Sequence, residues 1–379
     1  MKHYAKLKWF SIALSLLFFV LFITPAESLP QNVFTIPSNG IVIDGIKARA
    51  NEMLWGAVVS NTAWGSIDSS SSYRYGSYFS KTQINLMHQN GATALRIMLD
   101  KAPWDANDVK NIYSVPYKDY IKQLVTESHN AGIKVILDLT RDSSMGEDFD
   151  TGTAKAQVIT TPSLRTAWIN WGEEVVSYCK PDAIGIMNEP RGDVSFDYYY
   201  NSFLTPSINA YRSVDSDVNI VVMSMPFYSV ENFAKKPIDD AKVLYEFHIY
   251  YYCPMSNSGE YYKMACEAYG TGKLSEAKNC LFKYFDAKFS GIPTNRIIFG
   301  EFGPYEFTDA TWVNGLPDET RTPNWDAFLQ DVYNYAQDRE LNGAFQYSIG
   351  FSQYLMLDPR TDYTTFTPYG AVWAHHQPI

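Results

Sequence analysis

The chain has 379 residues, with 31 lysines and arginines against 41 aspartates and glutamates, which gives a formal net charge of -10. This acidic balance gives no electrostatic reason to bind nucleic acid or an anionic membrane, and it favours a neutral or cationic partner. The length allows two domains, but a barrel of about 250 residues or more commonly forms one unit. No long linker, charge block or repeat interrupts the chain, so we expect one domain.

The first 28 residues have the layout of a secretory signal peptide. Lysines at positions 2, 6 and 8 precede an uncharged stretch over residues 9–23, and the small residues Ala26 and Ser28 stand where signal peptidase reads the chain. The uncharged stretch is shorter than the roughly 20 residues of a membrane span, so we expect cleavage near Ser28, with an uncleaved anchor as the alternative. Cleavage would remove three lysines and one glutamate, leaving 351 residues with a net charge of -12.

Short apolar runs with strand character recur eight times after a short N-terminal arm. In the arm, residues 29–50, "VFTIPSNGIVIDG" resembles a hairpin that turns at Ser38-Asn39-Gly40. Segments with helical spacing, such as residues 117–130 and 325–339, separate the later runs. A glycine follows the helical run in "HNAG" and "HQNGA", as a left-handed C-cap requires. The eight predicted strands cover residues 52–58, 92–99, 134–139, 183–187, 218–223, 242–250, 296–300 and 341–348.

Alternating strands and helices predict an α/β fold with a parallel sheet. Eight such units close most naturally into a (β/α)8 TIM barrel with right-handed crossovers, which we expect over residues 51–379. An open doubly wound sheet is the alternative. It is disfavoured because "WGAVVSNTAW" follows the first strand where a glycine-rich nucleotide turn would stand.

Polar side chains stand at the carboxyl ends of four predicted strands. Residues at this end of a parallel barrel point into its site, so polar groups there favour a functional interpretation. Two glutamates stand at the tips of the fourth and seventh strands, nearly facing each other across the ring. For each residue taken alone, a solvated loop glutamate or a satisfied core histidine is the alternative. In strand order the residues are Arg96, then Asn188 and Glu189, then His248 and Tyr250, then Glu301.

The four cysteines do not form a disulfide framework at this chain length. Cys179 lies just before a predicted strand and Cys253 just after one, which would put them at opposite faces of a barrel. We therefore expect a bridge within Cys253, Cys266 and Cys280, with Cys253 to Cys266 favoured. Cys179 is expected to be a buried thiol.

The motifs "LRIML", "IMNEP", "EFHIYY" and "FGEFG", in this order and spacing, resemble glycoside hydrolase family 5, the retaining endoglucanase (cellulase) family among the barrel glycosidases. The resemblance covers residues 50–350. It implies that Glu189 is the acid/base and Glu301 the nucleophile. Retaining glycosidases hold these groups about 5 to 5.5 Å apart. Because two nearby carboxyl groups do not ionise easily together, we expect the pKa of Glu189 to be raised.

The resemblance also implies supporting roles and leaves two positions open. It implies that Asn188 contacts the sugar 2-hydroxyl, that Arg96 and Tyr250 flank the nucleophile, and that His248 lies beside the acid/base. Family members often carry a histidine after the third strand and a tryptophan at the end of the eighth, where this chain reads "LDLTRDSS" and "AFQYSIG". The residues considered for these places are Asp138, Arg141 and Tyr347.

Aromatic residues that follow strands are candidates for sugar contacts, because flat apolar sugar faces stack on rings without charge complementarity. Many of the 59 aromatic residues must instead be core, since the chain has 28 Tyr, 22 Phe and 9 Trp. The candidate substrate-binding residues are Trp64, Trp104, Tyr251, Tyr305, Trp312 and Tyr347.

Together these features predict a secreted, monomeric endo-β-1,4-glucanase that hydrolyses a β-linked polysaccharide by double displacement, without a cofactor or metal. Neither nucleic acid nor, after signal cleavage, a membrane is an expected partner. A β-mannanase or another β-glycanase would use the same carboxylates, and a non-catalytic glycan-binding barrel is the alternative outside the enzymes. A metal-dependent hydrolase is disfavoured, since the six histidines include no His-x-His on a strand.

Overall fold

The structure of the chain is a computed structural model. The barrel lies within the unit of residues 40–379. The predicted signal peptide and hairpin arm lie outside the described residues. None of the helices in the described part has the length and apolarity needed to cross a membrane. The described residues are 53–60, 66–67, 73–74, 79–109, 111–146, 149, 152–251, 259–304, 312–313, 316–317, 324–349, 356–357, 361 and 363–375.

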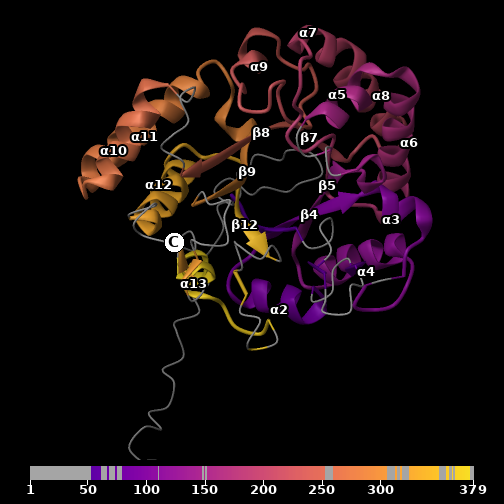
Figure 1. The fold of residues 1–379 in the computed structure, drawn as a ribbon, viewed down its shortest axis with the longest axis horizontal. Helices are drawn as coiled ribbons and strands as arrows, with labels where there is room; N and C mark the ends of the chain where they lie inside the picture. The colour runs from indigo at the N-terminus through magenta and orange to yellow at the C-terminus, as the bar shows by residue number, and fades with distance from the viewer. Residues whose placement is uncertain are drawn as a thin grey trace, which may run out of the picture. The chain divides into compact units, whose positions relative to one another are not determined.

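Eight parallel strands form a closed barrel in the order β1-β12-β9-β8-β7-β6-β5-β4 (Figure 1). All eight strands predicted for the barrel are present, so the expected (β/α)8 barrel is confirmed. Barrel strands that follow one another along the chain lie next to each other in the barrel, and β12 closes the ring against β1. The strands are β1 (Leu54–Val59), β4 (Ala94–Asp100), β5 (Lys134–Arg141), β6 (Ala183–Gly185), β7 (Asn219–Val222), β8 (Val243–Tyr251), β9 (Ile297–Pro304) and β12 (Gly343–Ile349).

Helices lie around these strands and cover the outside of the barrel (Figure 1). They are α2 (Lys81–Gln89), α3 (Lys101–Ala106), α4 (Tyr117–Asn130), α5 (Thr153–Thr160), α6 (Pro162–Cys179), α7 (Phe196–Tyr199), α8 (Thr205–Val214), α9 (Asn232–Lys235), α10 (Glu260–Gly270), α11 (Leu274–Lys288), α12 (Trp325–Asp338) and α13 (Pro368–His375). Shorter elements are the single turns η1 (Ser143–Met145) and η4 (Thr294–Arg296), the π-helical segment η3 (Tyr200–Leu204), and the paired strands β2 (Ser66–Ile67) with β3 (Tyr73–Arg74) and β10 (Trp312–Val313) with β11 (Leu316–Pro317).

The helix boundaries follow from local sequence. α4 has the predicted bounds and buries Tyr120, Ile121 and Leu124 along one face, at the i, i+1 and i+4 positions of an amphipathic helix. The glycines predicted to end helices, Gly91 and Gly132, have φ of 89° and 81°. Glycine adopts this left-handed conformation without a steric penalty, which turns the chain into the next strand.

Two glycines make room for carboxylates inside the barrel wall. Gly185 on β6 pairs with Asp138 on β5, and a β-carbon at Gly185 would overlap the Asp138 carboxylate. Gly300 on β9 lies in the same way against the Glu246 carboxylate of β8. The absent side chains therefore leave the space in which two acidic groups are buried.

Replacement of Gly300 with alanine is expected to lower the free energy of unfolding by about 1–3 kcal/mol, because the added methyl group would overpack the Glu246 carboxylate. Denaturant titration measures the change. Gly270→Ala is the matched control, since no atom lies within 4 Å of a β-carbon at Gly270. The control should stay within about 0.5 kcal/mol of wild type. Equal stability of the two variants would contradict the close packing.

Candidate active site

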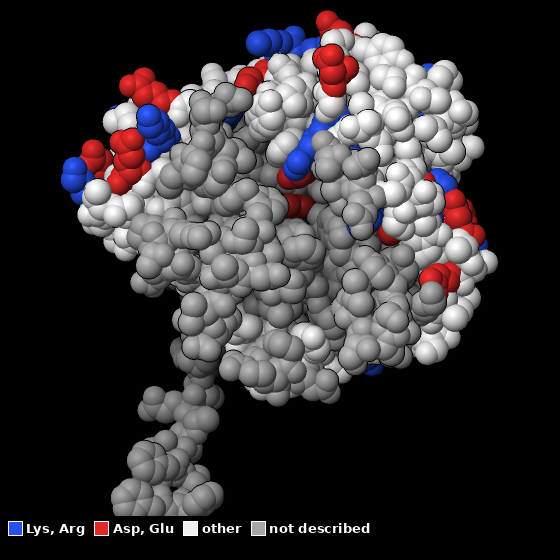
Figure 2. All heavy atoms as spheres, in the orientation of Figure 1, with Lys and Arg blue, Asp and Glu red and all other residues white. Residues whose placement is uncertain are grey.

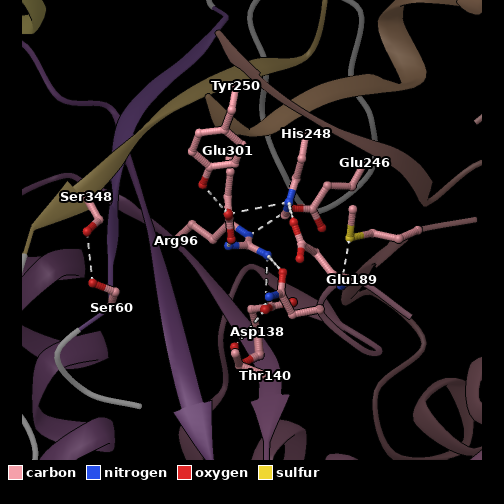
Figure 3. Close-up of polar contacts among 12 residues, drawn as sticks. Ser60, Arg96, Asp138, Thr140, Glu189, Glu246, His248, Tyr250, Glu301 and Ser348 are labelled. Atoms are coloured by element: carbon pink, nitrogen blue, oxygen red, sulfur yellow. Dashed lines mark hydrogen bonds and ion pairs between the residues drawn. The ribbon is translucent and has the colours of Figure 1, made fainter. Parts of the chain in front are cut away.

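The site is organised around the guanidinium of Arg96, which is completely buried. Nη1 donates to Glu301 Oε1 at 2.9 Å, and Nε lies 2.8 Å from Glu246 Oε1. Nη2 donates to Asp138 Oδ2 at 3.0 Å (Figure 3), and it also donates to Asn188 Oδ1 at 2.8 Å. One cation on β4 thus connects groups on β5, β8 and β9 and the segment that follows β6.

The protonation of this network follows from burial and charge. Burial lowers the pKa of Arg96, but the charges of Asp138, Glu246 and Glu301 outweigh it and raise the pKa above its ordinary value. For Asp138, burial is the largest effect and raises the pKa to about 6, although Arg96 opposes it. Arg96 therefore stays charged and offsets the carboxylates that the barrel buries.

Glu301 is held at both oxygens. Oε1 accepts from Arg96, and Oε2 accepts from the Tyr250 hydroxyl at 2.6 Å. His248 Nδ1 lies 3.4 Å from the same Oε2. Donors from β4 and β8 therefore fix the orientation of this carboxylate of β9.

Glu189 follows β6 in a strained conformation, with φ of 43°. Its backbone N–H donates to Met223 Sδ at 3.1 Å. Its side-chain Oε1 lies 3.0 Å from His248 Nδ1, and Oε2 accepts from Arg191 Nη2. Both oxygens are therefore occupied, and the side chain is 14% exposed.

His248 lies between two carboxylates. Nε2 is 2.9 Å from Glu246 Oε1, and Nδ1 is 3.0 Å from Glu189 Oε1. Ionised carboxylates only accept hydrogen bonds, so a histidine that serves both must donate from both nitrogens and carry a positive charge. Burial lowers the pKa of His248, but Glu301, Glu189 and Glu246 raise it to about 10 overall.

The expectation of a raised pKa for Glu189 is wrong for the ligand-free protein. Burial raises the pKa of this group, but the hydrogen bond from His248 and the charges of Arg191 and Lys155 lower it well below its usual range. The prediction considered only the like charge of Glu301, and the cations around Glu189 outweigh that repulsion.

Glu189 and Glu301 lie close together, as their positions at the ends of the fourth and seventh barrel strands predicted. One oxygen of Glu189, one oxygen of Glu301 and one ring nitrogen of His248 all lie within 4.8 Å of one another. Figure 2 shows acidic side-chain atoms in red at the bottom of a hollow, with basic atoms in blue beside them. Two carboxylates that lie this close together can reach the same bond of a bound molecule.

The structure adds residues that sequence reasoning missed. Glu246 was not predicted, although it stands two residues before His248 and strand periodicity places both on one face. Lys155 of α5 is buried and donates from Nζ to the Asn188 carbonyl oxygen at 2.7 Å, which supports the peptide that leads into Glu189. Arg191 contacts Glu189 directly. Helix and loop positions such as these carry no local signal of their contacts.

Two predicted sugar contacts are wrong. Trp104 is 1% exposed, because α3 begins directly after β4 and turns this ring edge-on to Tyr178 at 6.2 Å. Tyr251 is also 1% exposed and stacks on Phe328 at 5.2 Å. Adjacent strand residues face opposite sides, so Tyr251 packs toward the helices while its neighbour Tyr250 faces the site.

The other candidate aromatic residues remain predictions. Trp64 and Tyr305 lie outside the described residues, and Trp312 belongs to β10, where its side chain is not described. Tyr347 lies beside Tyr250, with ring centroids 6.0 Å apart. Tyr347 therefore lies next to the residue whose hydroxyl donates a hydrogen bond to Glu301.

Asp138 and Arg141, which were candidates for the place of the family's histidine after the third strand, have different surroundings in the structure. Asp138 lies under the site against Arg96. Arg141 lies 3.7 Å from Asp100 and has no ion pair with either Glu189 or Glu301 among the described residues. Asp138 is therefore part of the site's support.

The cysteine predictions are tested in part. Cys179 is a buried free thiol, as expected, and burial raises its pKa to about 12. Cys280 is also buried and free. Cys253 lies outside the described residues, so its bridge to the buried Cys266 stays a prediction.

A parallel eight-stranded barrel with two facing carboxylates at the carboxyl ends of its strands has the arrangement of a barrel glycoside hydrolase. A family model supports this class directly: "Cellulase (glycosyl hydrolase family 5)" matches residues 57–346. The chain belongs to this family and is a glycoside hydrolase.

Solved structures show the same fold at low sequence identity. An endoglucanase Cel5A from the hyperthermophilic Thermotoga maritima has a TM-score of 0.59 and 14% identity, covering 86% of this chain and 97% of its own. The same enzyme with a mannotriose substrate gives 0.58 and 14%, with the same coverage. A hyperthermophilic endo-β-1,4-glucanase in complex with substrate gives 0.56 and 17%, covering 86% and 98%. No curated protein sequence matches the chain.

Proposed function

We propose that this glycoside hydrolase is a retaining endo-β-1,4-glucanase. The observation that carries the mechanism is the close approach of the two carboxylates, with one oxygen of Glu189 within 4.8 Å of one oxygen of Glu301. Retention requires about 5 to 5.5 Å between the carboxyl groups, whereas inversion requires about 6.5 Å or more to admit a water. The short separation favours direct attack by one carboxylate.

Glu301 is the proposed nucleophile and Glu189 the proposed acid/base. Glu301 attacks the anomeric carbon while the bond to the leaving oxygen breaks, and Glu189 gives that oxygen its proton. In the second step Glu189 takes a proton from water, whose oxygen displaces Glu301 and restores the original configuration. Because the cations around Glu189 lower its pKa in the ligand-free protein, Glu189 must gain a proton before it can act as the acid.

Neighbouring groups support these two roles. Arg96 and Tyr250 orient Glu301 for attack. Arg96 also holds the Asn188 side-chain oxygen at 2.8 Å, which leaves the amide NH₂ to donate to a sugar 2-hydroxyl. Such a hydrogen bond strengthens as the sugar ring flattens toward the transition state.

β-1,4-Glucan is the proposed substrate. Support comes from the cellulase family and from a structural neighbour described as an endo-β-1,4-glucanase in complex with substrate. A second candidate is β-mannan, because the Thermotoga maritima neighbour was also crystallised with mannotriose. The same carboxylate pair serves both polymers, so the sugar preference depends on groups around it.

The test compares cleavage of soluble carboxymethyl-cellulose and glucomannan by wild type and Glu189→Gln. Wild type should release oligosaccharides, faster from the glucan, with the β-anomer formed first by NMR. Glu189→Gln should lose cleavage of both polymers but retain it on an activated aryl glycoside, whose leaving group needs little protonation. Glu174→Gln, an exposed glutamate 3.5 Å from Lys118, is the matched control. An α-anomer product would contradict retention, and absence of turnover would favour a glycan-binding barrel.

We further propose that the enzyme is secreted, with the signal-like residues 1–28 of the sequence as the support, and that it is a monomer. Mass spectrometry of protein recovered from the culture medium should find an N-terminus just after Ser28. Sedimentation should give the mass of one chain. Retention of residues 1–28 on a membrane-bound product would contradict the proposal.

A further inference from the structure

Arg191 contacts the carboxylate oxygen of Glu189 that His248 does not contact. Its Nη2 contacts Oε2, while His248 Nδ1 lies 3.0 Å from Oε1. The Arg191 side chain is 39% exposed, whereas Glu189 is 14% exposed and His248 is 1% exposed. Of these two partners of Glu189, the arginine is therefore the one that an incoming molecule can displace.

The fold positions this arginine closely. Its guanidinium carbon lies 4.7 Å from the centre of the Phe227 ring, and the Phe227 backbone N–H donates to the Pro190 carbonyl at 3.2 Å. A β-carbon at Gly152 would come within 2.8 Å of Arg191 Cβ. Gly192, with φ of 105°, lets the chain turn immediately after Arg191. Packing on both sides therefore holds Arg191 over Glu189.

We infer that Arg191 is a positioning residue that clamps Glu189 in the free enzyme and so controls when this acid/base carries its proton. The inference rests on the proposed acid/base role of Glu189. A guanidinium at one carboxylate oxygen competes with a proton for that oxygen, because both are positive and both need its lone pairs. A free enzyme clamped in this way loses its catalytic proton at a lower pH than an unclamped one.

Other charges face Glu189 as well, but they differ from Arg191 in burial. His248 and Glu246 approach from β8, Lys155 from α5, and Glu301 from β9, with Arg96 of β4 behind Glu301. All five side chains are at least nine-tenths buried. Removal of any of them would leave a buried partner without its counter-charge, whereas removal of the Arg191 charge at the edge would not.

The direction of the pH effect follows from the charges. The pKa of Glu189 is raised by burial and lowered by His248, Arg191 and Lys155. Without the Arg191 charge, the pKa of Glu189 must rise. The alkaline limb of kcat/KM reports the loss of the acid's proton in the free enzyme, so this limb should move to higher pH.

The experiment measures kcat/KM against pH on a soluble β-glucan for wild type, Arg191→Met and Arg191→Lys. Methionine keeps an apolar side chain over Phe227 without the charge. The alkaline limb of Arg191→Met should shift to higher pH by about one unit, so that kcat/KM beyond the wild-type limb is about tenfold higher than in wild type. Lysine keeps a charge and should restore most of the wild-type profile. Arg339→Met is the matched control, because Arg339 is 40% exposed and pairs with Asp286 away from Glu189.

A second substrate separates the possible failures. On an activated aryl glycoside the alkaline limb should not move, because this leaving group needs no proton from Glu189. An unshifted limb on the glucan in Arg191→Met, with wild type active, overturns the inference and leaves the proposed function intact. Absence of glucan cleavage by wild type overturns the proposed function itself. Arg191→Gln, with the same expected shift, replaces the methionine variant if that variant does not fold.

Discussion

Replacement of Glu301 with glutamine is expected to lower kcat on β-glucan by at least about 10⁴-fold. An amide of the same shape keeps the packing against Arg96 and Tyr250 but cannot form the proposed covalent glycosyl-enzyme. Steady-state kinetics on a soluble glucan measures the loss. Unlike Glu189→Gln, this variant should lose activity on an activated aryl glycoside too, because a good leaving group does not replace a nucleophile.

A smaller side chain tests the nucleophile role independently of the rate. In Glu301→Ala, added azide should enter the vacated space and attack the anomeric carbon, so that a β-glycoside yields an α-glycosyl azide. Wild type should give no such product. Turnover of Glu301→Gln within tenfold of wild type would contradict the assignment, and a β-glycosyl azide from the alanine variant would indicate that another group had attacked first.

Replacement of Arg96 with methionine is expected to lower the free energy of unfolding by about 3–5 kcal/mol. The side chain is completely buried, and the change would leave Asp138, Glu246 and Glu301 without their shared cation. Uncompensated buried charges are among the most destabilising defects in a protein. Denaturant unfolding measures the loss, and activity should fall with it because Glu301 loses one of its two orienting donors.

Two further variants control for the loss of volume and of surface charge. Arg339→Met removes an exposed arginine that pairs with Asp286 and should change stability by less than about 1 kcal/mol. Combining Arg96→Met with Asp138→Asn and Glu246→Gln should recover part of the lost stability, since two of the stranded charges disappear. Greater loss in the combined variant than in Arg96→Met alone would show that charge burial is not the cause.

The sequence predicted the barrel and the central part of the site for one physical reason. Strands that alternate with helices run parallel, so their carboxyl ends meet at one edge, and polar residues that follow apolar runs must gather there. Glu189 and Glu301, on strands three apart, were therefore expected to face each other. Glycines after helical runs, such as Gly91 and Gly132, marked where each helix returns to the barrel.

Tertiary structure alone decided which groups contact Glu189 and how they affect its proton. The positions of Arg191 and Lys155 depend on how a loop and a helix pack over β6, and no local pattern records such packing. The burial of Trp104 depends likewise on a helix that begins directly after β4. Sequence periodicity determines which way a strand residue faces. Charge balance in the site depends on distances between segments far apart in the chain, and only the folded barrel sets those distances.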